Sequence, residues 1–381
     1  MAARTIRTIV EGATGRLGNA QHLRALLALR NEGGLVLRNG DRLIPEPVLL
    51  GRNPDKLKAL ASAHGLTWST DRDACLADKS NEIYFDSSAT AGRFDRAQAA
   101  IAAGKHVYLE KPTAESLADA LALAASAQRA GIRHGVVQDK LFLPGLHKLR
   151  KVRESGFFGK ILSAKLDFGW WVFDGELYPA QRASWNYRKR DGGGLVLDMF
   201  PHWRYIVDRL IGDICSVSCR VSTLVAHRRD ETGQPYAVDV EDAAMATFEL
   251  AGGALVDVTS SWATRVKRDD MFTLQIDGEQ GSAACGLHRC YVQPLAATPK
   301  PHWNIEAERR ENFDDQWQEV PDVDRYSNPY RAAWELFLRH VADNASFASS
   351  LVEGAKGLQL VDACYRSHAE RRWIDLPALS V

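Results

Sequence analysis

The first third of the chain alternates short apolar runs with segments of helical periodicity. The apolar runs predict strands and the periodic segments between them predict helices: strands at 5–10, 47–50, 82–86, 105–110 and 133–138, and helices at 20–30, 91–103 and 114–130. Asn53-Pro54 is typical of a helix start, with asparagine as the cap and proline at the first helical position. Such repeated β-α units predict a doubly wound parallel sheet, an α/β fold.

A different pattern interrupts these units between the first helix and the second strand. Asn39-Gly40 stands between alternating apolar residues, which predicts a β-hairpin insertion at about 33–46. A solvent-exposed embellishment and a functional role both fit this segment, and we favour the first.

After residue 140 the strand-like stretches become longer and follow one another with few helices between them. They lie at 160–173, 214–227, 240–250, 253–264 and 269–277. This pattern predicts a second, α+β domain with a large, mostly antiparallel open-faced sheet. We therefore expect a dinucleotide-type domain at 1–140, the second domain at 141–350, and a helix and tail at 351–381 that return to the first domain.

Composition narrows the function classes. The 381 residues are 45% hydrophobic, and 48 basic residues balance 48 acidic ones, so no global attraction to nucleic acid or to an anionic membrane is expected. The N-terminus lacks the pattern of a secretory signal, and no window approaches the length of a membrane span. The six cysteines form no CxxC pair and no zinc-type set with histidine, which favours free thiols, no metal and a cytoplasmic location.

A glycine turn follows the first strand directly and opens a helix. Gly12, Gly15 and Gly18 give the spacing GxxGxxG, with Thr14 where a second glycine is usual. Glycines allow a tight turn and close backbone approach, and the free N–H groups of a helix start attract a pyrophosphate. The turn therefore predicts a nicotinamide dinucleotide, NAD(P), although a turn without a ligand remains the alternative. The predicted cofactor contacts are Gly12, Thr14, Gly15, Arg16, Leu17, Gly18, Arg52, Ser88, Glu110 and Lys111.

The end of the second strand bears on the choice between NAD and NADP. The strand ends Leu50-Gly51-Arg52-Asn53, without the carboxylate that would bind the ribose hydroxyls of NAD. Arg52 could accommodate a 2′-phosphate, which favours NADP. If Arg52 instead stacks on the adenine or faces water, NAD fits as well.

Two further segments carry candidate chemistry. Lys111, in Glu110-Lys111-Pro112, follows a parallel strand at the edge where such sheets hold ligands, and it could stabilise a substrate alkoxide. Asp198 and His202 are four residues apart behind a triple glycine, so on a helix they share one face. Histidine is a natural proton acceptor for alcohol oxidation, and Pro201 between them is tolerated if the helix has just begun. A surface turn and a surface helix pair are the respective alternatives.

The order of these motifs is more specific than each one alone. A dinucleotide turn, then Glu-Lys-Pro, then GlyGlyGly-x3-Asp-x3-His resembles the Gfo/Idh/MocA oxidoreductase family over essentially the whole chain. The resemblance implies a Rossmann domain, a sheet domain that often builds dimers or tetramers, and Lys111, Asp198 and His202 as the catalytic set. It also implies hydride transfer between NAD(P) and a secondary alcohol or ketone carbon of a sugar, glycoside or cyclitol. Two departures stand out: the insertion at 33–46, and the segment 87–93, which lacks a histidine that many relatives carry there.

Polar and aromatic residues in predicted loops are candidates for the substrate. We select Lys140, Tyr187 and Arg188, and with them Lys111, Asp198 and His202, as substrate contacts. Trp170, Trp171 and Phe173 fit a sugar face but fit a core or a subunit interface better. Two other functions stay open: a redox-assisted lyase or glycosidase that retains its cofactor, and a nicotinamide-binding regulator without catalysis.

Overall fold

The computed structural model describes residues 2–301, 312–322 and 324–381, which form two compact units. Unit 1 takes in the described residues of Met1–Phe142, Ser327–Gln359 and Ala378–Val381, and unit 2 those of Leu143–Tyr326 and Leu360–Pro377. The domain boundaries expected from the sequence, at residues 140 and 350, remain a prediction. None of the described helices is both long and apolar enough to cross a bilayer.

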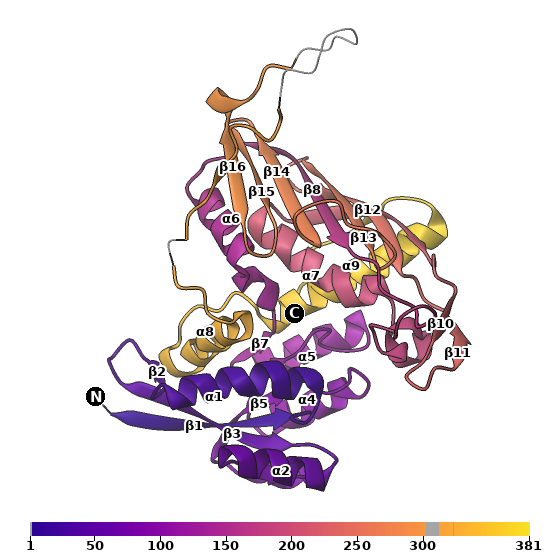
Figure 1. Ribbon diagram of the computed structural model, residues 1–381. Coiled ribbons are helices and arrows are strands. Elements are labelled where there is room, and N and C mark those ends of the chain that lie inside the picture. The colour runs from indigo at the N-terminus through magenta and orange to yellow at the C-terminus, as the bar shows by residue number, and fades with distance from the viewer. Residues whose placement is uncertain (1, 302–311, 323) are drawn as a thin grey trace. The chain divides into compact units, whose positions relative to one another are not determined.

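Unit 1 is built on a parallel sheet (Figure 1). Its parallel strands lie in the order β4 (Thr67–Ser69), β3 (Arg42–Leu50), β1 (Ala3–Glu11), β5 (Asn81–Asp86), β6 (His106–Leu109) and β7 (His134–Val136). This is the doubly wound order expected of a dinucleotide fold, and the predicted fold class is confirmed. The helices of the unit are η1 (Gly18–Leu23), α1 (Arg24–Asn31), α2 (Pro54–His64), α3 (Arg72–Ala77), α4 (Arg93–Ala102), α5 (Leu117–Arg129), η2 (Asp139–Phe142), α8 (Pro329–Asp343) and the first half of α9 (Leu351–Glu370).

Strand β3 is longer than the four-residue strand that was predicted. It runs from Arg42 to Leu50, and its first residues pair antiparallel with β2 (Leu35–Val36) while its whole length pairs parallel with β1. Pro45 and Pro47 lie between the stretches where β2 and β4 pair with the outer edge of β3. Proline is tolerated at such a position because no neighbouring strand needs its missing N–H.

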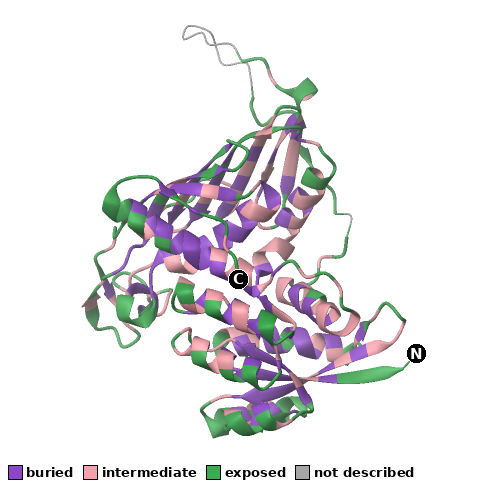
Figure 2. Ribbon diagram, turned by 180° about the vertical axis from the view of Figure 1, so that it is seen from behind, coloured by how far each residue is buried: buried purple, intermediate pink, exposed green. Residues whose placement is uncertain are grey.

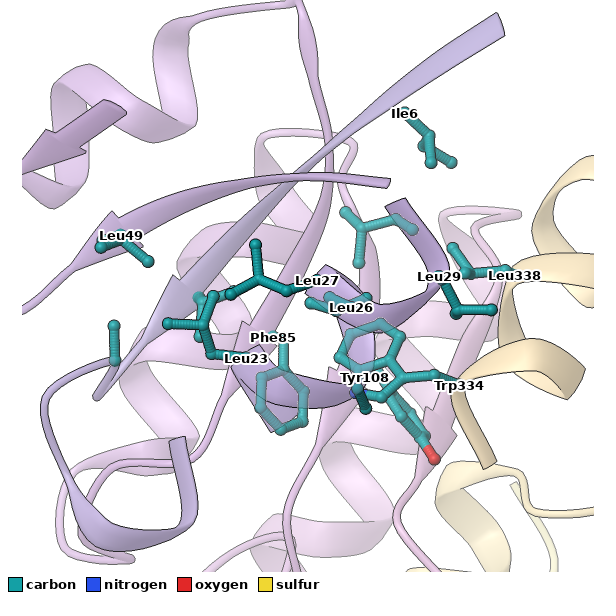
Figure 3. Close-up of a cluster of buried hydrophobic side chains, with 14 of the residues drawn as sticks. Ile6, Leu23, Leu26, Leu27, Leu29, Leu49, Phe85, Tyr108, Trp334 and Leu338 are labelled. Atoms are coloured by element: carbon teal, nitrogen blue, oxygen red, sulfur yellow. The ribbon is translucent and has the colours of Figure 1, made fainter. Parts of the chain in front are cut away.

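Helices α1 and α8 cover the same face of this sheet. Leu26 of α1 and Trp334 of α8 belong to one buried cluster with Phe85 and Tyr108 of the sheet (Figure 3). Phe337 of α8 belongs to the same cluster. The Tyr108 and Phe337 rings stack with centroids 4.4 Å apart. Helix α8 was not predicted, although its start is capped by the side chain of Asn328 before a proline. A segment far along the chain thus completes the core of unit 1.

Unit 2 is built on a nine-stranded sheet in the order β17-β16-β15-β14-β8-β13-β12-β9-β18. Its strands are β8 (Ile161–Gly169), β9 (Ile214–Ser222), β12 (Ala243–Leu250), β13 (Leu255–Ser261), β14 (Phe272–Gly278), β15 (Gly281–Cys285), β16 (Cys290–Pro294), β17 (Gln318–Glu319) and β18 (Ile374–Asp375). Only the β8–β13 pairing among these is parallel, so the predicted mostly antiparallel sheet is confirmed. A separate hairpin joins β10 (His227–Arg229) to β11 (Pro235–Ala237).

Burial alternates along the strands of this sheet, as Figure 2 shows. In β12, Ala246 and Phe248 are buried while Met245 and Glu249 are exposed. The buried side faces helices α6 (Pro144–Glu154) and α7 (Leu195–Leu210), and α9 (Leu351–Glu370) enters the unit in its second half. This alternation is what one buried face and one open face require. Short one-turn helices, η3 (Ser184–Tyr187), η4 (Lys189–Asp191) and η5 (Leu295–Ala297), complete the unit.

Candidate functional site

The glycine turn of unit 1 has the shape that its sequence predicted. Gly12 has a φ of +79°, and a Cβ placed there would lie 2.8 Å from the backbone nitrogen of Ser88. A Cβ at Gly18 would lie 2.3 Å from the Gly12 carbonyl oxygen. Both positions therefore require glycine, the first for the turn and the second for the close approach of the helix. Gly15 and Arg16, at the start of the helix, are exposed, as a pyrophosphate site needs.

The helix that follows the turn begins as a π-helix over Gly18–Leu23. Thr14 and Leu17, the other predicted contacts of the turn, are half-buried. The wide turn carries His22, which is 1% exposed, inward instead of presenting it to solvent. Irregular helical turns of this kind often occur at functional sites. The periodicity of 20–30 predicted an ordinary helix here, and nothing in it marked His22.

Two neighbouring strands of unit 1, β1 and β5, end in buried carboxylates. Glu11 at the end of β1 accepts two hydrogen bonds of 2.8 Å from Arg72, and Asp86 at the end of β5 accepts one of 2.8 Å from Arg96. Burial alone would raise the pKa of Asp86, but Arg93 and Arg96 bring it below its usual range. Ser88, a predicted cofactor contact, donates both its N–H and its hydroxyl to Asp86, at 2.8 and 2.6 Å. The loop after β5 is therefore well ordered, because its serine is tied to a buried charge.

Arg52 is the second residue after β3 and is exposed. Its neighbour Asn53 is occupied as the cap of α2, where its side chain accepts a hydrogen bond of 2.9 Å from the backbone N–H of Lys56. No carboxylate follows this strand before α2 begins, so the residue that would mark an NAD ribose contact is replaced by an available cation.

Lys111 follows β6 in a half-buried turn, and the bond between Lys111 and Pro112 is cis. Its N–H donates to the Glu110 carboxylate at 3.0 Å, and the other carboxylate oxygen lies 2.7 Å from Nε2 of His22. Burial raises the pKa of Glu110, but the hydrogen bond of His22 and the charges of Lys111 and Arg93 outweigh this and hold it below its usual range. The main chain of Lys111, at the predicted edge of the sheet, is therefore held by the buried carboxylate of Glu110.

In unit 2, Asp198 and His202 lie on α7, one helical turn apart. The expectation that Pro201 stands in the first turn is wrong, because α7 begins at Leu195 and Pro201 is inside the helix. A proline there leaves the carbonyl of Leu197 without its usual helical N–H partner. His202 is 5% exposed, so its imidazole is largely shielded from water.

Two side chains that the sequence analysis missed contact this pair. Nη2 of Arg182 donates to Asp198 at 2.7 Å, and the guanidinium lies 3.9 Å from the ring centroid of Trp262. Nδ1 of His202 lies 2.7 Å from the Tyr205 hydroxyl. Tyr205 could have been found from the sequence, because it stands three residues after His202 on the same helix. Arg182 has no such signal, since it stands 16 residues before Asp198 in an irregular segment.

The triple glycine before α7 serves the chain's own packing. A Cβ at Gly193 would lie 2.5 Å from the Asn186 carbonyl oxygen, and one at Gly194 would lie 2.8 Å from Oε1 of Glu241. The close approach that these glycines allow is therefore to residues 186 and 241 of the same chain. The glycines thereby fix the segment 184–188 beside the start of α7.

The predicted substrate residues fall in different surroundings. Tyr187 is 1% exposed, its ring lies under the Arg228 guanidinium at 4.0 Å, and burial raises its pKa to about 12. Its hydroxyl has no hydrogen-bond partner among the described residues. Arg188 stacks on Tyr236 at 4.6 Å in unit 2, and Lys140, in unit 1, pairs with Asp139 at 2.6 Å. Tyr187 and Arg188 thus belong to the segment packed against the start of α7, whereas Lys140 follows β7.

Comparisons with known proteins agree with this architecture. Residues 6–138 match the family described as "Oxidoreductase family, NAD-binding Rossmann fold", and residues 146–284 match "GFO/IDH/MocA C-terminal domain". A D-xylose dehydrogenase of Paenarthrobacter nicotinovorans is 44% identical over 382 residues, which cover 99% of this chain and 98% of that protein. A levoglucosan dehydrogenase of Pseudarthrobacter phenanthrenivorans is 25% identical and covers 87% of this chain and 90% of that protein.

Solved structures show the same fold. A levoglucosan dehydrogenase in complex with NADH and levoglucosan superposes with a TM-score of 0.82 at 20% identity, covering 98% of this chain and all of that one. The two domain matches and the similarity to a full-length relative show the family as well as the fold. This chain belongs to the Gfo/Idh/MocA family of NAD-binding oxidoreductases.

Proposed function

We propose that the protein is an NAD(P)-dependent dehydrogenase of a free aldose, with an aldopentose such as D-xylose as its preferred substrate. The observation that carries this proposal is the 44% identity over 99% of the chain to a D-xylose dehydrogenase. The geometry adds a glycine turn that admits a pyrophosphate, and the candidate residues Lys111, Asp198 and His202 on ordered elements.

The chain's own residues divide the chemistry of alcohol oxidation, in which one carbon loses a hydride and its oxygen loses a proton. When bound, the oxidised nicotinamide supplies the acceptor for the hydride. We assign the proton to His202: if its Nδ1–H donates to Tyr205, Nε2 is left as the accepting nitrogen. Asp198, held by Arg182, orients the substrate hydroxyl or the imidazole, and Lys111 stabilises the oxygen as it takes on alkoxide character.

Residues of the glycine turn would hold the cofactor. The exposed helix start at Gly15 and Arg16 offers backbone N–H groups to the pyrophosphate, and the absence of a carboxylate after β3 favours NADP, with Arg52 as the cation for its 2′-phosphate. The proposed preference for NADP differs from the levoglucosan dehydrogenase complex, which contains NADH.

An assay of nicotinamide reduction tests the proposed function. Purified protein is supplied with NAD⁺ or NADP⁺ and with D-xylose, L-arabinose, D-glucose, levoglucosan or myo-inositol, and absorbance at the reduced nicotinamide band is followed. We expect the highest kcat/KM for D-xylose. The product identifies the carbon, because oxidation at C1 of the ring gives a lactone and oxidation elsewhere gives a keto sugar.

Two variants make the assay specific to the site. Lys111→Met should lower kcat by about 10³-fold while the Kd of the reduced cofactor stays within about twofold, because a charge that acts on the transition state is removed. The matched control Lys165→Met removes an exposed lysine of β8 in unit 2. No reduction with any sugar and either dinucleotide, or equal rates for both variants, would refute the proposal. Cofactor bound but never reduced in bulk would point instead to a redox-assisted lyase or to a regulator.

We also propose that the protein forms a homo-oligomer in a reducing compartment. The open face of the unit 2 sheet exposes Met245 at 68% and Leu255 at 46%, which supports a homodimer or homotetramer that covers it. The six free cysteines favour a reducing compartment such as the cytoplasm. Light scattering of the protein at micromolar concentration tests the assembly, and a monomer would contradict it.

A further inference from the structure

The turn that contains Lys111 is hydrogen-bonded to a buried arginine. Arg93, the first residue of α4, is 2% exposed. Its Nη1 donates to the carbonyl oxygen of Glu110 at 2.9 Å and also to that of Pro112, the residues on either side of Lys111. Its Nη2 donates to the carbonyl oxygen of Ser88 at 2.5 Å. One rigid, planar group thus joins the loop after β5 to both flanks of Lys111.

The charge of Arg93 is balanced inside the unit. Its Nε lies 3.7 Å from Oδ1 of Asp86, which is itself fully buried and bonded to Arg96. A buried guanidinium is costly unless its charge is paired and its donors are satisfied. Here Nη1 and Nη2 donate to three main-chain carbonyls, so the hydrogen bonds of the arginine order backbone and not another side chain. Nε has no hydrogen-bond partner among the described residues and is paired with Asp86 by charge alone. Lysine, a point charge on a flexible stem, cannot span carbonyls in this way.

The opposite side of the turn is held by Glu110. One carboxylate oxygen accepts the Lys111 N–H, and the other accepts from Nε2 of His22. The tautomer of His22 follows from its second partner, because Nε1 of Trp334 points at Nδ1 at 3.1 Å and an indole nitrogen can only donate. Nδ1 is therefore the acceptor, and Nε2 carries the hydrogen that goes to Glu110.

We propose that Arg93 is a positioning residue for Lys111: it fixes the two peptide groups that flank the lysine, while the His22–Glu110 pair fixes the lysine's own N–H. Arg93 acts through the main chain and is not assigned any contact with the substrate. This inference rests on the proposed function for its kinetic consequence, but the geometry of the turn can be tested without it.

The experiment compares Arg93→Ala and Arg93→Lys with wild type. We expect Arg93→Ala to lower kcat by about 10²-fold, which is the usual cost of a displacement near 1 Å at a reacting group. The KM for the sugar and the Kd of the cofactor should change far less than kcat. Added guanidinium ion should restore at least tenfold of the loss in Arg93→Ala and nothing in Lys111→Met. Arg93→Lys should stay well below wild type, because one nitrogen cannot reproduce the fork.

A matched control separates positioning from stability. Arg129→Ala removes an exposed arginine from the end of α5, whose side chain donates to Ser126 of the same helix, so kcat should not change. If Arg93→Ala folds and keeps the wild-type kcat, the inference is wrong. It is also wrong if kcat and Tm fall while the cofactor Kd rises, and guanidinium restores none of them, since that is a loss of structure only.

A second variant decides the matter if Arg93→Ala does not fold. Glu110→Gln keeps the volume of the side chain but offers one oxygen where two hydrogen bonds are accepted, so one of the two donors, Lys111 N–H or His22, loses its acceptor. A fall in kcat of about tenfold or more at an unchanged Tm is expected, and an unchanged kcat would overturn the inference.

A measurement on Lys111 itself works even if no sugar is oxidised. Lysines are converted to ¹³C-dimethyl-lysine, and the Lys111 resonance is identified by its loss in Lys111→Met. Its chemical shift should move in Arg93→Lys and Glu110→Gln and stay constant in Arg129→Ala. A wild-type protein without sugar oxidation would sink the proposed function alone, whereas an unmoved Lys111 resonance in both variants would sink the positioning role alone.

Discussion

The two parts of the proposed catalytic set are held in different ways. Lys111 stands in a turn, and its main chain is fixed by side chains from elsewhere in unit 1, namely Arg93, Glu110 and His22. Asp198 and His202 stand on α7, where the helix itself fixes the main chain and partners such as Arg182 and Tyr205 contact the side chains. A group in a turn thus depends on buried neighbours for its position, whereas a group on a helix depends on them mainly for its orientation and protonation.

The largest expected effect on kcat comes from a substitution on α7. Removal of the imidazole in His202→Ala should lower kcat by about 10²–10⁴-fold, the range found for general acid–base groups. Tyr205→Phe should cost much less, about tenfold, because it removes only the partner of Nδ1. Steady-state rates with D-xylose at several pH values check both. Equal losses in the two variants would mean that Tyr205 and not His202 moves the proton.

Arg182 should have the next largest effect. Arg182→Met keeps much of the packing over Trp262 but leaves Asp198 without its 2.7 Å partner, so kcat/KM should fall by about 10–100-fold. Arg182→Lys keeps the charge and should lie between this variant and wild type. Circular dichroism and Tm should show little change, because both side chains are partly exposed.

Lys189→Met is the matched control for Arg182, since it removes an exposed cation of the same segment. If the Arg182 and Lys189 variants have the same kcat/KM, the contact between Arg182 and Asp198 has no part in the reaction. A loss confined to KM would mean that Arg182 binds the sugar and does not orient Asp198.

The comparison also explains what the sequence could and could not predict. The spacing of Asp198 and His202, the glycine turn and the β-α units of a parallel sheet are local or periodic patterns, and each was predicted. The contacts that hold the turn of Lys111 are not local in sequence. His22 and Glu110 are 88 positions apart, and Trp334 and His22 are 312 apart. No period or spacing relates such residues, because the packing of α8 and the π-turn at Gly18–Leu23 bring them together.

Arg52 should have a smaller effect, confined to cofactor binding. Arg52→Ser removes the cation after β3, so the Kd of NADPH should rise by about tenfold and that of NADH should change by less than about twofold. Titration by nicotinamide fluorescence measures both. Lys58→Ser, an exposed lysine of α2, is the control. A parallel rise for both nucleotides would mean that Arg52 contacts the adenine or ribose and does not select a 2′-phosphate.

The smallest expected effect is a difference in acid stability between the units. In unit 1, burial first and nearby positive charges second lower the pKa of His106 and of His134. Each Nδ1 accepts a main-chain N–H, from Arg133 at 3.0 Å and from Leu351 at 3.3 Å, so each ring folds in the neutral form. Because the unfolded chain binds these protons more readily, stability is complete above about pH 6.5 and falls as the pH drops through the lowered folded values.

Hydrogen exchange at pH 7.5 and 5.5, corrected for intrinsic rates, measures this difference. Protection of β6 and β7 should fall more than that of β12 and β13. His106→Gln keeps an acceptor for the Arg133 N–H without a titrating group, so it should flatten the pH dependence in β6, whereas the exposed His64→Gln should leave it as it is. An equal loss of protection in both units would assign the acid response to charges spread over the whole chain instead of to the neutral histidines beside β6 and β7.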